Sequence, residues 1–186
     1  MADRDTLTRS LHDIGLAAWF GGSLMGAIGL NGAGAAVLDD KERARVASAG
    51  WAKWTPVNAV AIGAHLVGAA GVLRGNKGRV ATQQGVGAST AAKTALTVVA
   101  LGATAYARVV GKKIENAGPV PAQGPTDPSA ETPPDVARAM RQEKIAQWVL
   151  PVATGGLLVL NALHGEQQRT TEVVSGTLRK LNPFGS

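Results

Sequence analysis

Three histidines, His12, His65 and His164, are the residues of this 186-residue chain whose type best suits chemistry. Neutral imidazole is an axial ligand of haem iron and a ligand of copper, so each histidine is a candidate cofactor ligand. Cysteine is absent, which excludes disulfides, Cys-ligated zinc, iron–sulfur clusters and thiol chemistry. Neither a Ser–His–Asp order nor an HExxH pattern occurs. We therefore expect no catalytic residues, no dedicated metal cluster and no enzyme.

One stretch approaches a nucleotide-binding motif. Residues 87–94 read GASTAAKT, which differs from the P-loop GxxxxGKT by Ala92 in place of the second glycine. A P-loop follows a buried strand, but the preceding segment RVATQQGV is no such strand, and an apolar run follows. We interpret the stretch as a polar helix start with Lys93 at a membrane edge, and expect no nucleotide binding.

The elements that position the histidines are apolar runs. Three stretches lack charged residues over at least the roughly 20 residues that cross a hydrocarbon core. A fourth stretch, centred on 94–107, is shorter, and the side chains of Lys93 and Arg108 at its edges can extend outward. A soluble four-helix bundle is the alternative, but a soluble helix needs a polar face, and GLAAWFGGSLMGAIGL has only Ser23 to offer. We predict an all-α integral membrane four-helix bundle forming a single domain over 1–186, with spans at about 14–38, 54–73, 91–111 and 145–165.

The connections differ in composition. Residues 117–135 contain most of the prolines, so we expect a flexible, extended linker without a core of its own between the third and fourth helices. The tail 166–186 has apolar residues at helical spacing and predicts an amphipathic helix. No carboxylate falls inside a predicted span, since Asp13 and Glu166 lie at span edges, so a secondary transporter is disfavoured.

Small residues at helical spacing predict close helix packing, because they let two backbones approach. Gly22 and Gly26 form a GxxxG pattern on the first span, and two interpretations are open: self-association, or packing against another span of the same chain. Trp51, Trp54 and Trp148 lie at span edges, as an interfacial aromatic belt requires. The complete set of expected packing positions is Gly22, Gly26, Gly29, Ala33, Ala64 and Gly68.

The predicted spans assign depths to the histidines. His12 and His164 fall at the same membrane face, where they could together hold a haem. His65 falls about 10 residues into its span, roughly 15 Å deep, too far from either to share a haem. A histidine at that depth is expensive unless partnered. It is therefore either a ligand at a different site, or a structural residue hydrogen-bonded to Thr97 or Thr104, with Asn58 on the same helix face.

The formal net charge of +6 could indicate nucleic acid binding. The basic residues instead flank the apolar runs, where lipid headgroups would meet them, so we expect a lipid bilayer as partner and no nucleic acid. Four spans place both termini on one side, and the positive-inside rule, applied to the shorter connections, favours termini in the cytoplasm of a cell-membrane protein.

The segment LHDIGLAAWFGG, residues 11–22, has the pattern LHxxxxxxWxGG. This pattern resembles the first helix of small four-span membrane proteins of the copper-resistance CopD type and of HemJ-like proteins. The resemblance covers His12, Trp19, Gly21 and Gly22. It implies a helical membrane bundle and, for some members, haem or copper handling with the first-helix histidine as a ligand.

Two functional hypotheses follow. The first is a multi-pass membrane protein that forms a homo-oligomer or serves as an accessory subunit of a larger membrane complex. The second is a haem- or copper-binding membrane protein that uses His12 with His164, for which haem b or copper would be the cofactor.

Overall fold

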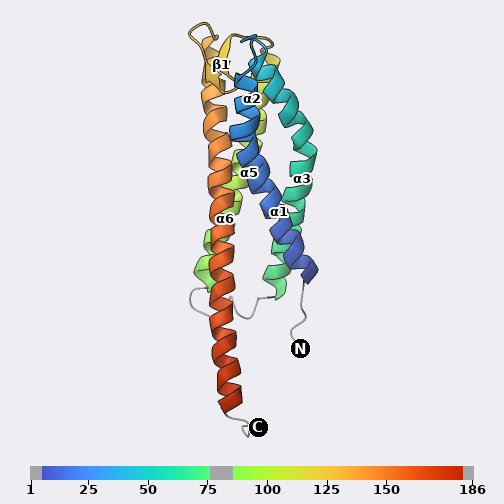
Figure 1. The fold of residues 1–186 in the computed structure, drawn as a ribbon, viewed down its shortest axis with the longest axis vertical. Helices are drawn as coiled ribbons and strands as arrows, with labels where there is room; N and C mark the ends of the chain where they lie inside the picture. Colours follow the sequence, from blue (N-terminus) through green and yellow to red (C-terminus); the bar gives the residue numbers. More distant parts are fainter. Residues whose placement is uncertain (1–5, 76–85, 182–186) are drawn as a thin grey trace.

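The computed structural model describes the backbone of residues 6–75 and 86–181, and the side chains of residues 6–74 and 88–163. The described chain is mostly helical, which confirms the all-α class (Figure 1). The first helical segment comprises α1 (Thr6–Met25), a π-helical turn η1 (Gly26–Leu30) and α2 (Asn31–Ala35). It is followed by α3 (Arg43–Gly75), α5 (Val86–Asn116), the strands β1 (Ala122–Gly124) and β2 (Asp127–Pro128), and α6 (Pro134–Leu181).

Four helical segments are long and apolar enough to cross a membrane: Thr6–Ala35, Arg43–Arg74, Ala88–Asn116 and Pro134–Leu163. Each helical segment is longer than the apolar run that predicted it, and the second and third extend beyond their runs at both ends. These bounds are those of helices and not of membrane crossings, so the predicted span limits stay predictions.

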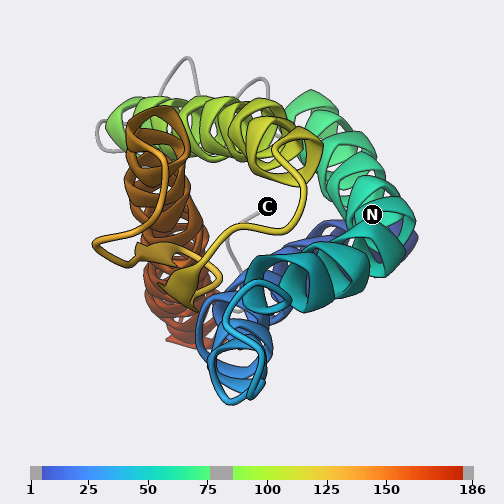
Figure 2. The ribbon, with the colours of Figure 1, turned by 90° about the horizontal axis from the view of Figure 1, so that it is seen from above.

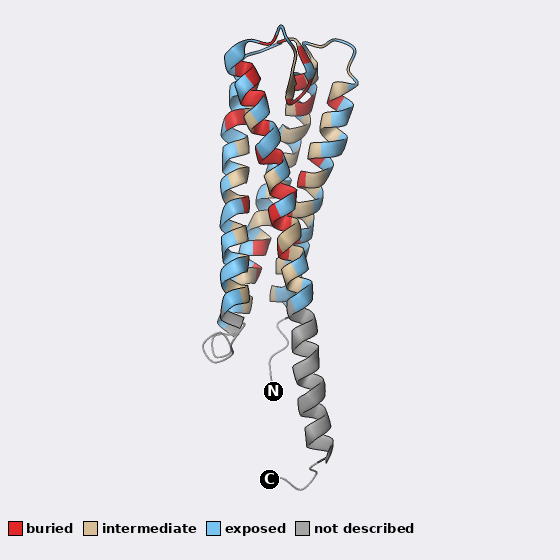
Figure 3. Ribbon diagram, turned by 90° about the vertical axis from the view of Figure 1, so that its left-hand side faces the viewer, coloured by how far each residue is buried: buried red, intermediate tan, exposed pale blue. Residues whose placement is uncertain are grey.

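The outer surface of the bundle is apolar along its length. Exposed side chains include Val60, Val67, Val109, Ile145 and Val152, and buried residues lie on the inward faces (Figure 3). A bundle dissolved in water presents a polar stripe to the solvent. The apolar exterior and partly polar interior are the pattern expected of helices surrounded by lipid.

The helices form two antiparallel pairs. α1 packs along α3, and α5 packs along α6, while α1 also contacts α6 and so joins the two pairs (Figure 2). α3 and α5, although consecutive in the chain, make few contacts. A core of Trp19, Ala100, Leu150 and Ala153 lies where α1, α5 and α6 meet.

The segment 117–135 is not an extended linker. β1 pairs antiparallel with β2, and the side chains of Val120, Ala122 and Thr126 are buried. Val120 and Ala122 join a core with Val110, Ile114, Met140 and neighbouring residues, so this end of the bundle carries a packed cap. Proline and polar residues reduce regular secondary structure, but they do not prevent a few apolar side chains from packing on helix ends.

Arg43 holds the cap to α3. Its Nε donates to the Val37 carbonyl at 2.8 Å, and its Nη1 donates to the carbonyls of Ala122 and Gln123 at 2.9 and 3.2 Å. The planar guanidinium presents several donors in a fixed geometry, so one side chain satisfies three backbone acceptors.

The predicted glycine stripe packs within the chain. A Cβ atom at Gly22 would lie 1.9 Å from the ring of Trp54, and one at Gly26 would lie 2.1 Å from the ring of Trp51. Both tryptophans therefore fill the groove on α1, and their predicted place in an interfacial belt stays a prediction. Gly68 also packs closely, since a Cβ there would approach the His12 backbone nitrogen to 2.3 Å.

Two positions of the predicted stripe, Gly29 and Ala33, are exposed and take no part in this packing, while Ala64 is half-buried. The π-helical turn η1 explains the difference, because a π-helix has more residues per turn than an α-helix and so rotates the inward face. After η1 the buried glycine is Gly34, which packs against Pro125 of the cap.

α6 extends to Leu181, and the side chains beyond Leu163 lie outside the described residues. The amphipathic character predicted for 166–186 therefore stays a prediction.

Candidate functional site

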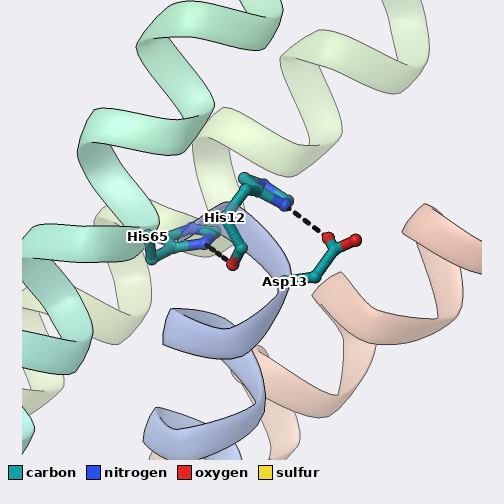
Figure 4. Close-up of polar contacts among 3 residues, drawn as sticks. All are labelled: His12, Asp13 and His65. Atoms are coloured by element: carbon teal, nitrogen blue, oxygen red, sulfur yellow. Dashed lines mark hydrogen bonds and ion pairs between the residues drawn. The ribbon is translucent and has the colours of Figure 1, made fainter. Parts of the chain in front are cut away.

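His12 of α1 and His65 of α3 lie in direct contact (Figure 4). Their ring centroids are 4.5 Å apart, with ring planes tilted by 40°. His65 Nδ1 donates to the backbone carbonyl of His12 at 3.3 Å, since a carbonyl can only accept. His12 Nδ1 lies 2.8 Å from the carboxylate of Asp13. The Nδ1 atom of each histidine therefore takes part in one of these two contacts, and the Nε2 atoms do not.

The expectation that His65 lies at a different depth from His12 is wrong. α1 begins at Thr6 and α3 ends at Gly75, and the two helices run antiparallel. At 1.5 Å per residue, His12 lies about 9 Å and His65 about 15 Å from the same end of the bundle. The depth error came from placing the start of the first span at residue 14.

Glycines bring the two histidines together. A Cβ at Gly15 would approach the His65 backbone nitrogen to 2.5 Å, and Gly68 has the same relation to His12. At both positions the nearest atoms belong to the backbone, which cannot turn aside as a flexible side chain can. Because the backbones of α1 and α3 nearly touch at two levels, the imidazoles have only the narrow space between them.

A third ring completes this cluster. Trp19 lies seven residues, or about two helical turns, after His12 on α1. Its ring centroid is 6.0 Å from that of His65. Trp19 is fully buried, and His65 is 2% exposed. The predicted threonine partners are not used: Thr97 and Thr104 each donate to a carbonyl of their own helix, at 2.9 and 2.8 Å.

The side chain of His164 lies outside the described residues. The predicted combination of His12 with His164 therefore stays a prediction. Among the described side chains, no group of three or more His, Cys, Asp or Glu residues could hold a metal ion. His12 and His65 alone offer at most two imidazole ligands.

A second polar cluster lies towards the cap. Trp51 Nε1 donates to Asn31 Oδ1 at 3.4 Å, Asn31 Nδ2 donates to Gln147 Oε1 at 2.6 Å, and Gln147 Nε2 donates to Glu143 Oε1 at 3.0 Å. The four side chains come from α3, α2 and α6. In this series of three hydrogen bonds, each residue donates to the next one in the direction of Glu143. Glu143 is 8% exposed. A cavity of about 270 Å³ borders the cluster, with Asn31, Gln147, Asp127 and Lys144 among its lining residues.

Sequence reasoning missed this cluster. It began the last span at Ile145 and so treated Glu143 as a residue flanking the membrane, whereas α6 already begins at Pro134. The available signal was spacing, because Gln147, Thr154 and Asn161 recur every seven residues on α6. Positions seven apart lie on one helix face.

No family model matches the sequence, and no curated protein or solved structure shows significant similarity to it.

Proposed function

We propose that this protein is a multi-pass protein of the cell membrane that self-associates or serves as an accessory subunit of a larger membrane complex. The observation that supports it is the distribution of polarity. The exposed faces of four long helices are apolar, and the buried polar groups lie between helices. A bilayer stabilises that arrangement and water does not. Recovery of the protein in the supernatant after an alkaline carbonate wash of membranes would overturn the proposal.

The contact surface we propose is the outward face of the first span. Gly22 and Gly26 are covered by tryptophans, but Gly21, Gly29, Gly32 and Ala33 are exposed. A Cβ atom at Gly21 or Gly32 would meet nothing within 4 Å. Small residues on a lipid-facing surface let a second helix approach closely, and close packing drives association in lipid.

The test is the native mass in mild detergent of the Gly32→Leu variant. A leucine there adds bulk to the proposed contact at a position where a Cβ atom meets nothing within 4 Å, so the mass of the assembly should fall. Gly63→Leu is the matched control, because Gly63 of α3 is also exposed with nothing within 4 Å of its Cβ position. A monomeric wild-type protein, or equal masses for the two variants, contradicts self-association through this face.

We propose that both termini are cytoplasmic, in keeping with the positive-inside rule. The chain contains no cysteine, so single cysteines can report sidedness without further changes. Ala130→Cys lies on an exposed position of the cap, and Thr6→Cys lies at the start of α1. A membrane-impermeant maleimide added to intact cells should label the first and not the second. The reverse pattern would place the termini outside.

The contact between His12 and His65 favours a second candidate function, copper binding. Their Nδ1 atoms are engaged and the Nε2 atoms are left as ligands, as in sites where the second nitrogen orients a metal-bound ring. A haem between these two rings does not fit, because centroids 4.5 Å apart are those of directly packed rings. A haem on His12 and His164 stays a proposal on the resemblance.

Two measurements separate these candidates. Purified protein from haem-replete, copper-supplemented cells is analysed for a Soret band and for bound copper. A copper content lost in both His12→Ala and His65→Ala supports the copper site, and a Soret band lost in His12→Ala and retained in His65→Ala supports a haem on His12 with His164. If the purified protein contains neither copper nor haem, both cofactor proposals are contradicted, and the accessory role is the function that stays proposed.

A further inference from the structure

A second cavity, of about 510 Å³, opens on the outside of the bundle between the first helical segment and α3. All of its lining residues belong to α1, η1 or α3, and none belongs to α5 or α6, so it does not face the interior. Met25, one of the lining residues, is 65% exposed, so the cavity is an open groove. Gly22, Gly26 and Gly50 also line it and leave it room, because they carry no side chain. We call this cavity the outer groove.

The π-helical turn η1 forms part of the outer groove. Gly26 and Leu30, the first and last residues of η1, both line it. Leu30 packs on α3, because a Cβ atom at Gly50 would lie 2.6 Å from Leu30 Cδ1. π-helical turns are rare, and they occur often at functional sites. The outer groove therefore coincides with an uncommon local structure, which a plain seam between two α-helices does not need.

The lining of the outer groove suits hydrocarbon. The rings of Trp51 and Trp54 line it, and the first helical segment contributes residues from the stretch 22–30. The nearest charged residues on that segment are Asp13 and Asp39, each about 13 Å of helix from the nearer end of the stretch. In a bilayer this stretch lies at the depth of the acyl chains. The volume of the groove is within the roughly 300–1,000 Å³ that is typical of ligand sites.

Lys53 is the single charged residue that lines the outer groove. It is exposed, and it belongs to none of the ion pairs among the described residues. It directly precedes the charge-free run of α3 that begins at Trp54. A cation on a lipid-facing surface is costly without an anionic partner. Helical side chains lean towards the helix N-terminus, and α3 begins at the cap, so we expect the lysine stem to extend towards the cap.

We propose that the outer groove binds one anionic phospholipid. The lipid phosphate accepts a hydrogen bond from Lys53 Nζ, and one acyl chain lies against the rings of Trp51 and Trp54. The phosphate supplies the anion that Lys53 lacks among the described residues, and the acyl chain gives the apolar lining a contact partner. This inference rests on the membrane location proposed above. It goes beyond the accessory role, because it assigns a specific lipid site to the α1–α3 pair.

The charge and the length of the groove favour this occupant over two others. A zwitterionic lipid carries an ammonium group beside its phosphate, which Lys53 repels, so its binding is weaker. A helix of a second copy would contact the stretch 22–30 over only about 12 Å of the roughly 30 Å that it spans. The self-association proposed above uses Gly32 and its exposed neighbours, which do not line the outer groove. The two proposals therefore do not compete for one surface.

Tryptophan fluorescence measures occupation of the groove. Of the four tryptophans in the chain, Trp19 is fully buried, and Trp51 and Trp54 line the groove, so the Trp148→Phe variant reports on the groove. This full-length variant is reconstituted in phosphatidylcholine bilayers, and phosphatidylglycerol with brominated acyl chains replaces a rising share of the lipid. Bromine quenches only nearby indoles. Quenching should saturate at a low share of brominated phosphatidylglycerol, whereas brominated phosphatidylcholine should quench in proportion to its share.

Substitution of Lys53 in the Trp148→Phe background tests the charge. The lysine should give brominated phosphatidylglycerol about a fivefold preference over brominated phosphatidylcholine, the size expected for one basic residue at a membrane surface. Lys53→Gln should abolish the preference, and Lys53→Arg should keep it, because arginine keeps the charge. Lys113→Gln is the matched control, since Lys113 of α5 is also exposed and does not line the groove. This control should keep the full preference.

Three results overturn the proposal. The first is an equal preference in Lys53→Gln and Lys113→Gln. The second is the absence of saturable quenching, which a second copy seated on the groove would also give. The third is a brominated fatty acid that quenches as well as brominated phosphatidylglycerol, because the groove would then take any anionic chain.

Trp148 separates these results from a failure of the membrane location. It is 44% exposed, so brominated phosphatidylcholine should quench it in the unsubstituted protein if the helices span the bilayer. No quenching of Trp148 would contradict the membrane location itself. Quenching of Trp148 without a lipid preference at Trp51 and Trp54 would overturn the lipid site alone.

Discussion

Two adjacent glycines should respond in opposite ways to the same methyl group. Gly22 faces α3, where a Cβ would lie 1.9 Å from Trp54 Cζ2 and 2.4 Å from its Cε2. Gly21 faces outward, and a Cβ there meets nothing within 4 Å. Gly22→Ala must therefore push the indole or separate the helices, whereas Gly21→Ala only adds a better helix former.

The expected changes in the free energy of unfolding follow from the surroundings of the two glycines. Overpacking of a close contact costs about 1–3 kcal/mol. Replacing an exposed helical glycine by alanine is favourable by up to about 1 kcal/mol in soluble helices, and less where the same residue contacts lipid. The free energies of unfolding of Gly22→Ala and Gly21→Ala should therefore differ by about 1–4 kcal/mol.

The assay is reversible unfolding in mixed micelles with increasing SDS, followed by helical circular dichroism. The circular dichroism signal is chosen because Trp54 itself is part of the contact. Trp54→Ala supplies the second half of a double-mutant cycle: in that background Gly22→Ala should lose its cost, because the ring that it strikes is gone. Equal stabilities for Gly21→Ala and Gly22→Ala, or no coupling between Gly22 and Trp54, would refute the packing of α1 on α3.

Two further predictions concern the cap and the histidine cluster. Arg43→Lys should destabilise the protein by about 1–3 kcal/mol in the same assay, because an ammonium cannot reach the Val37, Ala122 and Gln123 carbonyls together. Arg45→Lys, at an exposed position two residues later, is the control. Equal losses of stability in the two variants would contradict the role of Arg43. His65→Phe should cost less than His65→Ala, since phenylalanine keeps the ring contacts with His12 and Trp19 while alanine leaves a cavity worth roughly 2–4 kcal/mol. A larger loss for phenylalanine would mean that its bulkier ring does not fit the space between α1 and α3, and would contradict this prediction.

The apolar runs were enough to predict four helices, because the length and charge pattern of a membrane span are read directly from the sequence. The helix ends were not predictable in this way. Arg43 and Glu143 lie in charged flanks that single-residue hydropathy assigns to water, and burial under the cap depends on contacts between residues about 80 positions apart. The contact between His12 and His65 was missed because hydropathy places the start of the first span at residue 14 and does not give the register in which α1 packs on α3.

The predictions for the cap and for the glycine stripe were incomplete for a different reason. Residues 117–135 have the composition of a linker, and only the positions of Val120 and Ala122 against the helix ends give them a core. Gly22 and Gly26 were correctly identified as packing positions, but a GxxxG pattern does not say which helix fills it. The sequence places Trp51 and Trp54 near a span edge, and the antiparallel register of α1 and α3 places their rings in the groove of α1.

The scarcity of contacts between α3 and α5 has a consequence for biogenesis. The chain leaves the ribosome in the order α1, α3, α5, α6, and α1 has its principal partner as soon as α3 has been made. The tryptophans of α3 can then fill the α1 groove while the rest of the protein is still being translated. α5 has no such partner among the helices that precede it, so it waits for α6. The polypeptide is thus suited to insertion as two successive helical hairpins, which dock through α1 and α6 and are closed last, when Arg43 meets the carbonyls of Ala122 and Gln123.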